Sequence, residues 1–296
     1  MHIEILAIVL ATVLPITLAV AIGFVMARSK RQIDTETISR LATDFAMPAL
    51  VFGTLAKGTT DWVEFVRMAG AGVLSLALLG AVGAVALRCA GLRLRTYVPS
   101  LTWGNGAFIG YPVALYAFGN IGLTHAIAFA AGSQVFNCTV VQAYAAGAAN
   151  WRAVMRSPLL YAVVLGVLVR IAGLPLPVAV ANSCSLLGGM TVPLMLILVG
   201  HSLARIPVTS VTRAALFSLF RIAMGASIAV GVAYMVGLGG VARSVLILQC
   251  SMPVAVLSYV FAQRWNNEPD EVAGLVVAST WMSVVSIPSL LGLLVE

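Results

Sequence analysis

Charged side chains are scarce in this sequence. Asp, Glu, Lys and Arg make up only 9% of its 296 residues, whereas hydrophobic residues make up 61%. Soluble domains usually contain about 25% charged residues. A soluble fold of this length could not bury so much apolar surface, because roughly half or more of any folded surface stays in contact with water. The composition therefore excludes a soluble protein and indicates a chain whose main solvent is lipid.

Motifs of several other function classes are also missing. The four cysteines form no CxxC pair, so neither a disulfide framework nor a zinc site is expected. HExxH, GxSxG and Walker A motifs are absent, which argues against a membrane enzyme and against transport driven by bound ATP. The net charge is +7, but the basic residues form no stripe beside stacking aromatics, so no nucleic acid partner is expected. No cofactor and no metal are predicted.

Long apolar runs fill the remainder of the chain. A membrane-spanning helix needs about 20 mostly apolar residues. Ten such runs are found, near residues 3–27, 38–56, 65–87, 97–118, 122–146, 158–173, 177–203, 212–236, 242–262 and 271–295. We therefore predict an all-α integral membrane protein with ten transmembrane helices. The first run is interpreted as a helix and not as a signal peptide, because no basic residue precedes it.

Basic residues are distributed unequally between the two ends of these helices. Only Lys57, Arg67, Arg170 and Arg243 lie on one side. The other side holds Arg28, Lys30, Arg31, Arg40, Arg88, Arg93, Arg95, Arg152, Arg156, Arg205, Arg213 and Arg264. Because short cytoplasmic loops carry the excess of Lys and Arg, the larger set is placed in the cytoplasm. We expect a multi-pass protein of the plasma (inner) membrane with both termini outside the cytoplasm.

The two halves of the chain resemble each other. Three proline motifs recur in the same order and at nearly constant separation: Pro15 with Pro158, Pro48 with Pro193, and Pro112 with Pro253. Each half has five helices, an odd number, so the halves must insert in opposite directions. This is the inverted-repeat architecture of many secondary transporters. We place the first repeat at 1–146, a cytoplasmic connector at 147–157 and the second repeat at 158–296.

Helices 4 and 9 are expected to be broken in the middle of the membrane. Helix 4 contains GNGAFIGYP (104–112), and helix 9 contains LQCSMPVAVLS (248–258). Proline removes a helix bond and glycine loosens the backbone, and lipid cannot satisfy the freed groups. A symmetric pair of breaks favours a midplane site over ordinary proline kinks. Half-helices starting at Pro112 and Pro253 would direct N–H groups at a carboxylate.

The same segments resemble the auxin efflux carrier family. NGAFIGYP (105–112) is similar to its fourth helix, TVPLMLILVGHSLA (191–204) to its seventh, and 252–291 to its ninth and tenth. The resemblance covers the whole chain and implies two inverted repeats of five helices, with helices 4 and 9 crossing at their prolines. It also implies export or exchange of small carboxylates such as malonate, malate or auxin-like acids. The chain lacks the long central loop of the large plant carriers, so it resembles a compact prokaryotic member.

These features predict a secondary transporter of a small organic anion that works by alternating access. An uncoupled anion channel or exchanger and a ligand-binding membrane sensor are the alternatives. The expected substrate-binding residues are Asn105, Gly106, Gly110, Tyr111, Pro112, Ser251, Met252, Pro253, Ser258, Gln134 and Asn137. Leu257 stands where the family often has an asparagine.

Asp44 and Arg221 are the charged residues within apolar runs that are considered for a functional role. Asp44 is a candidate for proton or sodium coupling, although it could instead simply reach cytoplasmic water. Arg221 could be a counter-charge for the substrate, but its long side chain is expected instead to extend toward the cytoplasmic interface. The expected partners are the carboxylate substrate and the lipid bilayer, while the coupling ion and a homodimer stay open.

Overall fold

The computed structural model describes residues 2–29, 34–57, 61–141, 155–205 and 211–294. Most of the predicted connector (147–157), and the basic residues Lys30, Arg31 and Arg152, lie outside these ranges. The described residues are almost entirely helical and contain no strand beyond one isolated bridge. The helices are α1 (His2–Arg28), α2 (Thr35–Leu41), α3 (Met47–Lys57), α4 (Trp62–Cys89), α5 (Leu94–Thr102), α6 (Tyr111–Phe136), α9 (Pro158–Ile171), α10 (Val178–Gly189), α11 (Thr191–Arg205), α12 (Val211–Val236), α13 (Gly240–Cys250), α14 (Val256–Trp265) and α15 (Pro269–Leu294).

Five described helical segments are long and apolar enough to cross a membrane. They are Trp62–Cys89, Gly106–Gln134, Val178–Arg205, Arg213–Val236 and Pro269–Leu294. Shorter apolar helices are Leu14–Arg28, Pro158–Ile171 and Gly240–Cys250. The prediction of an all-helical, multi-pass membrane protein is confirmed. Several of the ten predicted runs are divided by a break or a bend, which shortens the individual helices.

Three π-helical turns interrupt the regular helices: η1 (Ala42–Ala46), η2 (Gly106–Gly110) and η3 (Asn137–Val141). The first two stand directly before a residue followed by proline, at Pro48 and Pro112. The proline ring clashes with the carbonyl of the preceding turn and supplies no N–H. A π turn, with its bonds from residue i to i+5, is wider than an α turn. The wider turn makes room for the ring, so both helices continue through their prolines.

Predicted helices 4 and 9 are each divided by a short extended break. Helix 4 is interrupted between α5, which ends at Thr102, and η2, which starts at Gly106. Helix 9 is interrupted between Cys250 and Val256. The prediction that the half-helices start at Pro112 and Pro253 is therefore wrong. Flexible glycines break helix 4 before its proline is reached, and the second half of helix 9 starts after its proline.

The two breaks form hydrogen bonds with each other. Asn105 N–H donates to Pro253 O at 2.8 Å, and Ala255 N–H donates to Trp103 O at 2.9 Å. Val254 N–H, between Pro253 and Ala255, donates to the hydroxyl of Ser279 on α15 at 3.0 Å. Backbone groups that have lost their helical partners are thus satisfied by protein, as the apolar surroundings demand.

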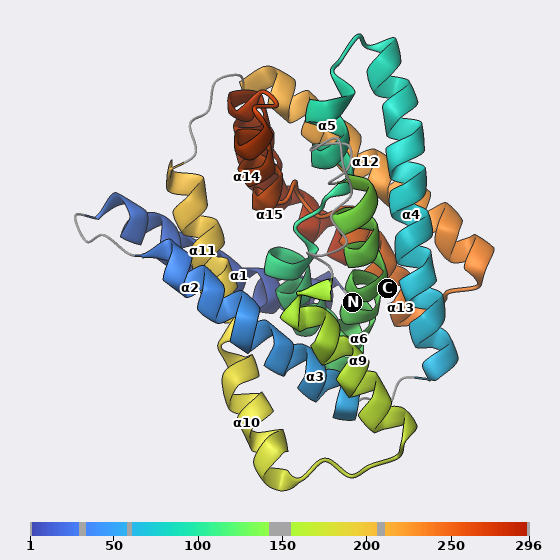
Figure 1. Ribbon diagram of the computed structural model, residues 1–296. Coiled ribbons are helices and arrows are strands. Elements are labelled where there is room, and N and C mark those ends of the chain that lie inside the picture. The colour runs from blue at the N-terminus through green and yellow to red at the C-terminus, as the bar shows by residue number, and fades with distance from the viewer. Residues whose placement is uncertain (1, 30–33, 58–60, 142–154, 206–210, 295–296) are drawn as a thin grey trace.

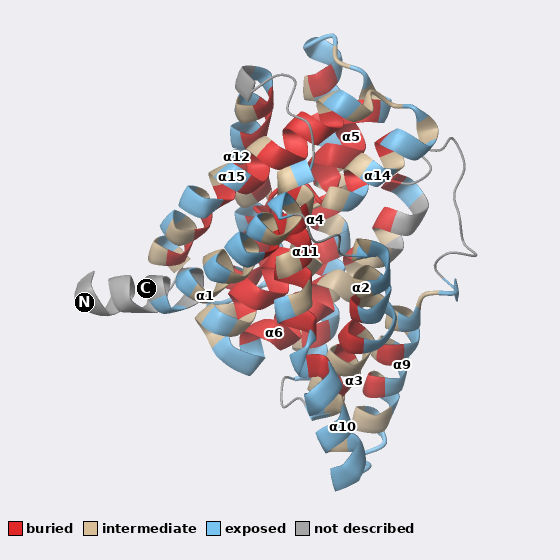
Figure 2. Cartoon of the chain, turned by 90° about the vertical axis from the view of Figure 1, so that its left-hand side faces the viewer, coloured by how far each residue is buried: buried red, intermediate tan, exposed pale blue. Residues whose placement is uncertain are grey.

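The helices fall into two groups (Figure 1). In the first, α1 packs on α11, and α3 packs on α9 and α10; in the second, α4, α5, α6, α12, α13, α14 and α15 pack together. α1 and α11 can approach closely because Gly23 and Gly200 have no side chain. A Cβ on Gly23 or Gly200 would lie 2.0 or 1.9 Å from a carbonyl oxygen of the other helix. Buried residues concentrate where the groups meet, along α4, α5, α6 and α11 (Figure 2).

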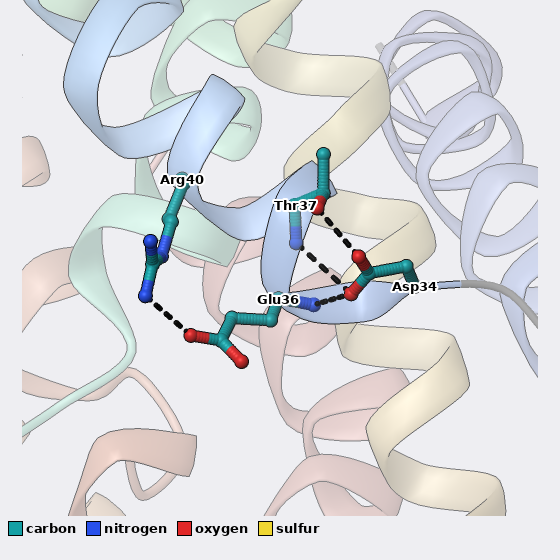
Figure 3. Close-up of polar contacts among 4 residues, drawn as sticks. All are labelled: Asp34, Glu36, Thr37 and Arg40. Atoms are coloured by element: carbon teal, nitrogen blue, oxygen red, sulfur yellow. Dashed lines mark hydrogen bonds and ion pairs between the residues drawn. The ribbon is translucent and has the colours of Figure 1, made fainter.

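The start of α2 is fixed by local polar contacts. The Asp34 carboxylate accepts the N–H groups of Glu36 and Thr37, at 3.1 and 3.2 Å, and the Thr37 hydroxyl, while Arg40 pairs with Glu36 (Figure 3). This cap satisfies N–H groups that lack a helical partner. The hydrogen bonds, first that of the Thr37 hydroxyl, hold the pKa of Asp34 below its usual value. The capped helix continues into η1, which carries Asp44.

Candidate functional site

A cavity of about 250 Å³ lies where the two broken helices meet. Its wall includes the break residues Trp103, Gly104 and Asn105, and Ala255 from the opposite break. Residues of η1, α4, α6, α12 and α13 complete it. The cavity also reaches Ser39, Thr43, Asp44, Asn137 and Ser157, which lie in segments that the sequence places toward the cytoplasm. It therefore extends from the break toward one end of the helices.

The structure brings part of the predicted residue set to this cavity. Asn105, Gly106, Gln134, Asn137 and the coupling candidate Asp44 line it. The remaining predicted residues do not: Gly110, Tyr111, Pro112, Ser251, Met252, Pro253 and Ser258. Two of these are core residues, because Tyr111 is 1% exposed and Met252 is 0% exposed.

Asn105 is held rigidly at the centre of the site. Its N–H bonds to Pro253 O, and its carbonyl accepts the N–H groups of Ile109 and Gly110 at 3.1 and 3.2 Å. The side chain is 2% exposed, and neither amide atom has a hydrogen-bond partner among the described residues. Buried polar groups are nearly always paired. This amide is therefore available to a bound molecule.

Arg221 also lines the cavity, and the expectation that it extends to the interface is wrong. It is 1% exposed. Its Nε donates to Ser100 O at 3.2 Å, while Nη1 has no partner in the described part of the chain. α12 packs against α4, α13 and α15, so this face of the helix points into the protein. The sequence did mark Arg221 as a functional candidate, since a charge inside an apolar run is one by default. It did not show which face of α12 points into the protein.

Gln249, at the end of α13, is a site residue that the sequence analysis missed. It is 2% exposed, and both amide atoms lack a partner among the residues described. A Cβ on Gly106 would lie 2.6 Å from Gln249 Oε1, and a Cβ on Gly110 would lie 2.5 Å from the same atom. A Cβ on Gly104 would lie 2.7 Å from Arg221 Nη2. The glycines of helix 4 thus leave space for two polar side chains from the other half of the chain.

Asp44 and Leu257 complete the wall at its edges. Asp44 is exposed and accepts the Thr43 hydroxyl at 3.2 Å. Leu257 also lines the cavity, whereas Ser258 beside it is buried with no partner for its hydroxyl within the described ranges. Helix 9 therefore supplies its polar side chain before the break, from Gln249, and an apolar one after it.

A second cavity, of about 500 Å³, lies toward the opposite helix ends. Lys57, Asn120 and Ser185 line it, in segments that the sequence places outside, and Lys57 Nζ lies 3.3 Å from Ser185 Oγ. On α3, Met47 lines the first cavity, and Ala49 and Leu50 line the second. The two cavities therefore come within two residues of each other along α3.

Broken helices that meet inside the molecule, with a cavity on each side, are typical of membrane transport proteins. The comparison with known families agrees. A family model described as "Membrane transport protein" matches residues 8–146 and 140–291. The chain belongs to this family, that of the auxin efflux carriers.

Individual relatives fall into two kinds. An uncharacterized transporter of Methanothermobacter thermautotrophicus is 29% identical over 294 residues, covering 94% of this chain and 95% of its own length. An uncharacterized transporter of Methanocaldococcus jannaschii is 24% identical, covering 84% of this chain and 86% of its own length. Auxin efflux carrier component 1 of Arabidopsis thaliana is 28% identical, but over 43% of this chain and 22% of its own length. The full-length likeness is therefore to compact archaeal transporters.

Proposed function

We propose that this chain is a secondary carrier of a small organic anion, which binds in the cavity where the broken helices meet. The observation that carries the proposal is Asn105, which lines this cavity and whose buried amide has no partner in the described chain. The half-helix that starts at Gly106 directs the positive end of its dipole to the same place. A carboxylate suits both groups, because it accepts hydrogen bonds and carries negative charge.

The packing of the helices supports two inverted repeats of five. An inverted repeat makes helix 1 equivalent to helix 6 and helix 2 equivalent to helix 7. A contact between helices 1 and 7 then has its counterpart between helices 6 and 2, and both occur, as α1 with α11 and α9 with α3. α6 is kinked at Gly119, and the part after the kink, which corresponds to predicted helix 5, contacts α4 through Phe129 and Gly132. This contact has its counterpart in that of α12 with α15.

The two cavities support alternating access over an open channel. They lie toward opposite helix ends, and on α3 the lining changes from the first cavity at Met47 to the second at Ala49. Small movements of one helix group against the other would open one cavity and close its counterpart. Asp44, in the wall of the cavity that reaches the predicted cytoplasmic side, is the candidate for ion coupling.

The test is uptake into proteoliposomes. Labelled malonate, malate and indole-3-acetate are offered with and without a proton or sodium gradient. We expect accumulation of at least one of them, and about 10- to 100-fold weaker binding of it by Asn105→Ala, because a hydrogen bond to a charged group contributes about 1.5–3 kcal/mol. Asn182→Ala, on the exposed side of α10, is the matched control and should behave as wild type. Absence of uptake of every acid, or full activity of Asn105→Ala, would contradict the proposal.

A further inference from the structure

Arg221 carries a positive charge that is buried within a membrane-spanning segment and is only partly paired. The guanidinium has five N–H donors; Nε is bonded to Ser100 O, and Nη1 has no partner in the described part of the chain. None of the ion pairs among the described residues includes Arg221. A buried charge is costly unless an opposite charge accompanies it. An anionic ligand in the cavity would supply that charge.

Two amide side chains lie in the same wall. The glycines on either side of Asn105 touch the neighbouring polar groups: Gly104 lies against Arg221 Nη2, and Gly106 lies against Gln249 Oε1. The Asn105 and Gln249 amides are both buried and without partners in the ranges described. Arg221 of α12 and Gln249 of α13 therefore lie beside the two glycines that flank Asn105, and all three residues line the cavity.

We propose that Arg221 and Gln249 bind the carboxylate of the transported anion, and that this arrangement selects monocarboxylates over dicarboxylates. The inference rests on the proposed function and narrows its substrate class. Arg221 offers the planar, charged donor pair that fits a carboxylate, and Gln249 supplies a further N–H. The only other charged side chain that lines the described cavity is Asp44, which is acidic. A second carboxylate on the substrate would find no cation there and would be repelled by Asp44.

Part of the remaining wall is apolar and suits an apolar substrate body. Leu76, Phe108, Phe129, Leu159 and Leu257 form this part. A cavity of roughly 150 Å³ lined by apolar side chains can hold benzene. The present cavity, at about 250 Å³, has room for a body of that size with a carboxylate attached.

The test measures binding, not transport, on the purified chain by isothermal titration calorimetry. Hexanoate, adipate and hexanamide share one carbon skeleton and differ in charge. We expect hexanoate to bind at least about ten-fold more tightly than either of the others. Arg221→Gln should weaken hexanoate binding about 10- to 100-fold and leave hexanamide binding unchanged. Arg221→Lys should fall between, since lysine keeps the charge but loses the planar donor pair.

Arg243→Gln, at an exposed position of α13, removes the same charge outside the cavity and should bind as wild type. If Arg221 had only a structural role, neutralising the carbonyl ends of α5 and α13, Arg221→Gln would lower the melting temperature. The ratio of hexanoate affinity to hexanamide affinity would then stay unchanged. That result would overturn the proposal, as would adipate binding as tightly as hexanoate, or no hexanoate binding by the folded wild type. Charge-selective binding without uptake in liposomes would support the proposal and contradict the carrier function instead.

Discussion

Replacing Gly110 by alanine adds a methyl group where the Gln249 side chain lies. The new Cβ would be 2.5 Å from Gln249 Oε1 and 2.8 Å from Nε2. These atoms are the end of a flexible side chain, so Gln249 moves while the backbones stay in place. Alanine is also about 0.5–1 kcal/mol more favourable than glycine within a helix. We therefore expect unchanged or slightly higher stability, together with the loss of about 1.5–3 kcal/mol of hydrogen bonding to a charged ligand.

Gly225, on α12, is the matched control because its added Cβ would meet backbone. It would lie 2.2 Å from Cys250 O and 2.9 Å from the Cys250 carbonyl carbon. Neither atom can move unless α13 shifts away from α12, and overpacking of this kind typically costs about 1–3 kcal/mol. Gly225→Ala should therefore lower the melting temperature.

Thermal unfolding and hexanoate titration are measured on both variants. For Gly110→Ala we expect a wild-type melting temperature with hexanoate affinity about 10- to 100-fold lower. For Gly225→Ala we expect the melting temperature to fall. If Gly110→Ala is stable and binds hexanoate as tightly as wild type, Gln249 does not contact the ligand, and the explanation given for the glycines of helix 4 is refuted.

Three further outcomes are expected. A membrane-impermeant maleimide should label Cys184 in intact cells and the exposed Cys89 only after permeabilisation, and the reverse pattern would invert the topology. Glu271→Ala should lower the melting temperature, because the Glu271 carboxylate accepts a 2.7 Å hydrogen bond from the Tyr97 hydroxyl on α5; an unchanged value would show that the bond contributes little. The Asp34 pKa is lowered, first by the Thr37 hydroxyl, so its stabilising effect is complete above its ordinary pKa of 3.8 and is lost as pH falls below it. In the wild type, amide hydrogen exchange at the start of α2, corrected for the intrinsic rate, should then become faster in acid. In Asp34→Ala the corrected exchange rate should not change with pH.

The fold class could be predicted because the lipid environment demands a simple pattern. Apolar runs of membrane-spanning length identify the helices regardless of how they pack. The break in helix 4 could also be located, since Gly104 and Gly106 flank Asn105 within three residues. Asn105, which the sequence analysis predicts to bind substrate, lines the cavity.

The identity of the other cavity residues depends on which face of a helix points inward. A nearly uniform apolar run gives little information about that face, so Arg221 could be assigned to the interface as readily as to the site. Gln249 was missed for a different reason. Gln249 lies on α13, before the break, whereas the predicted binding residues of helix 9 begin at Ser251, after α13 ends. Only the packing of α13 against α6 and η2 brings the Gln249 side chain to the glycines of helix 4, in the other half of the chain.

The two breaks, although equivalent in sequence position, contribute differently to the site. In helix 4 glycines break the chain, and Pro112 is accommodated by the π turn before it. In helix 9 Pro253 lies in the break, and the preceding half-helix carries Gln249. The first half of the chain thus supplies space and one amide, whereas the second half supplies a larger amide and, through Arg221, the charge. A substrate with one charged end has a defined orientation in such a site. We therefore expect its carboxylate to face α12 and α13, with its apolar body toward α4 and α6.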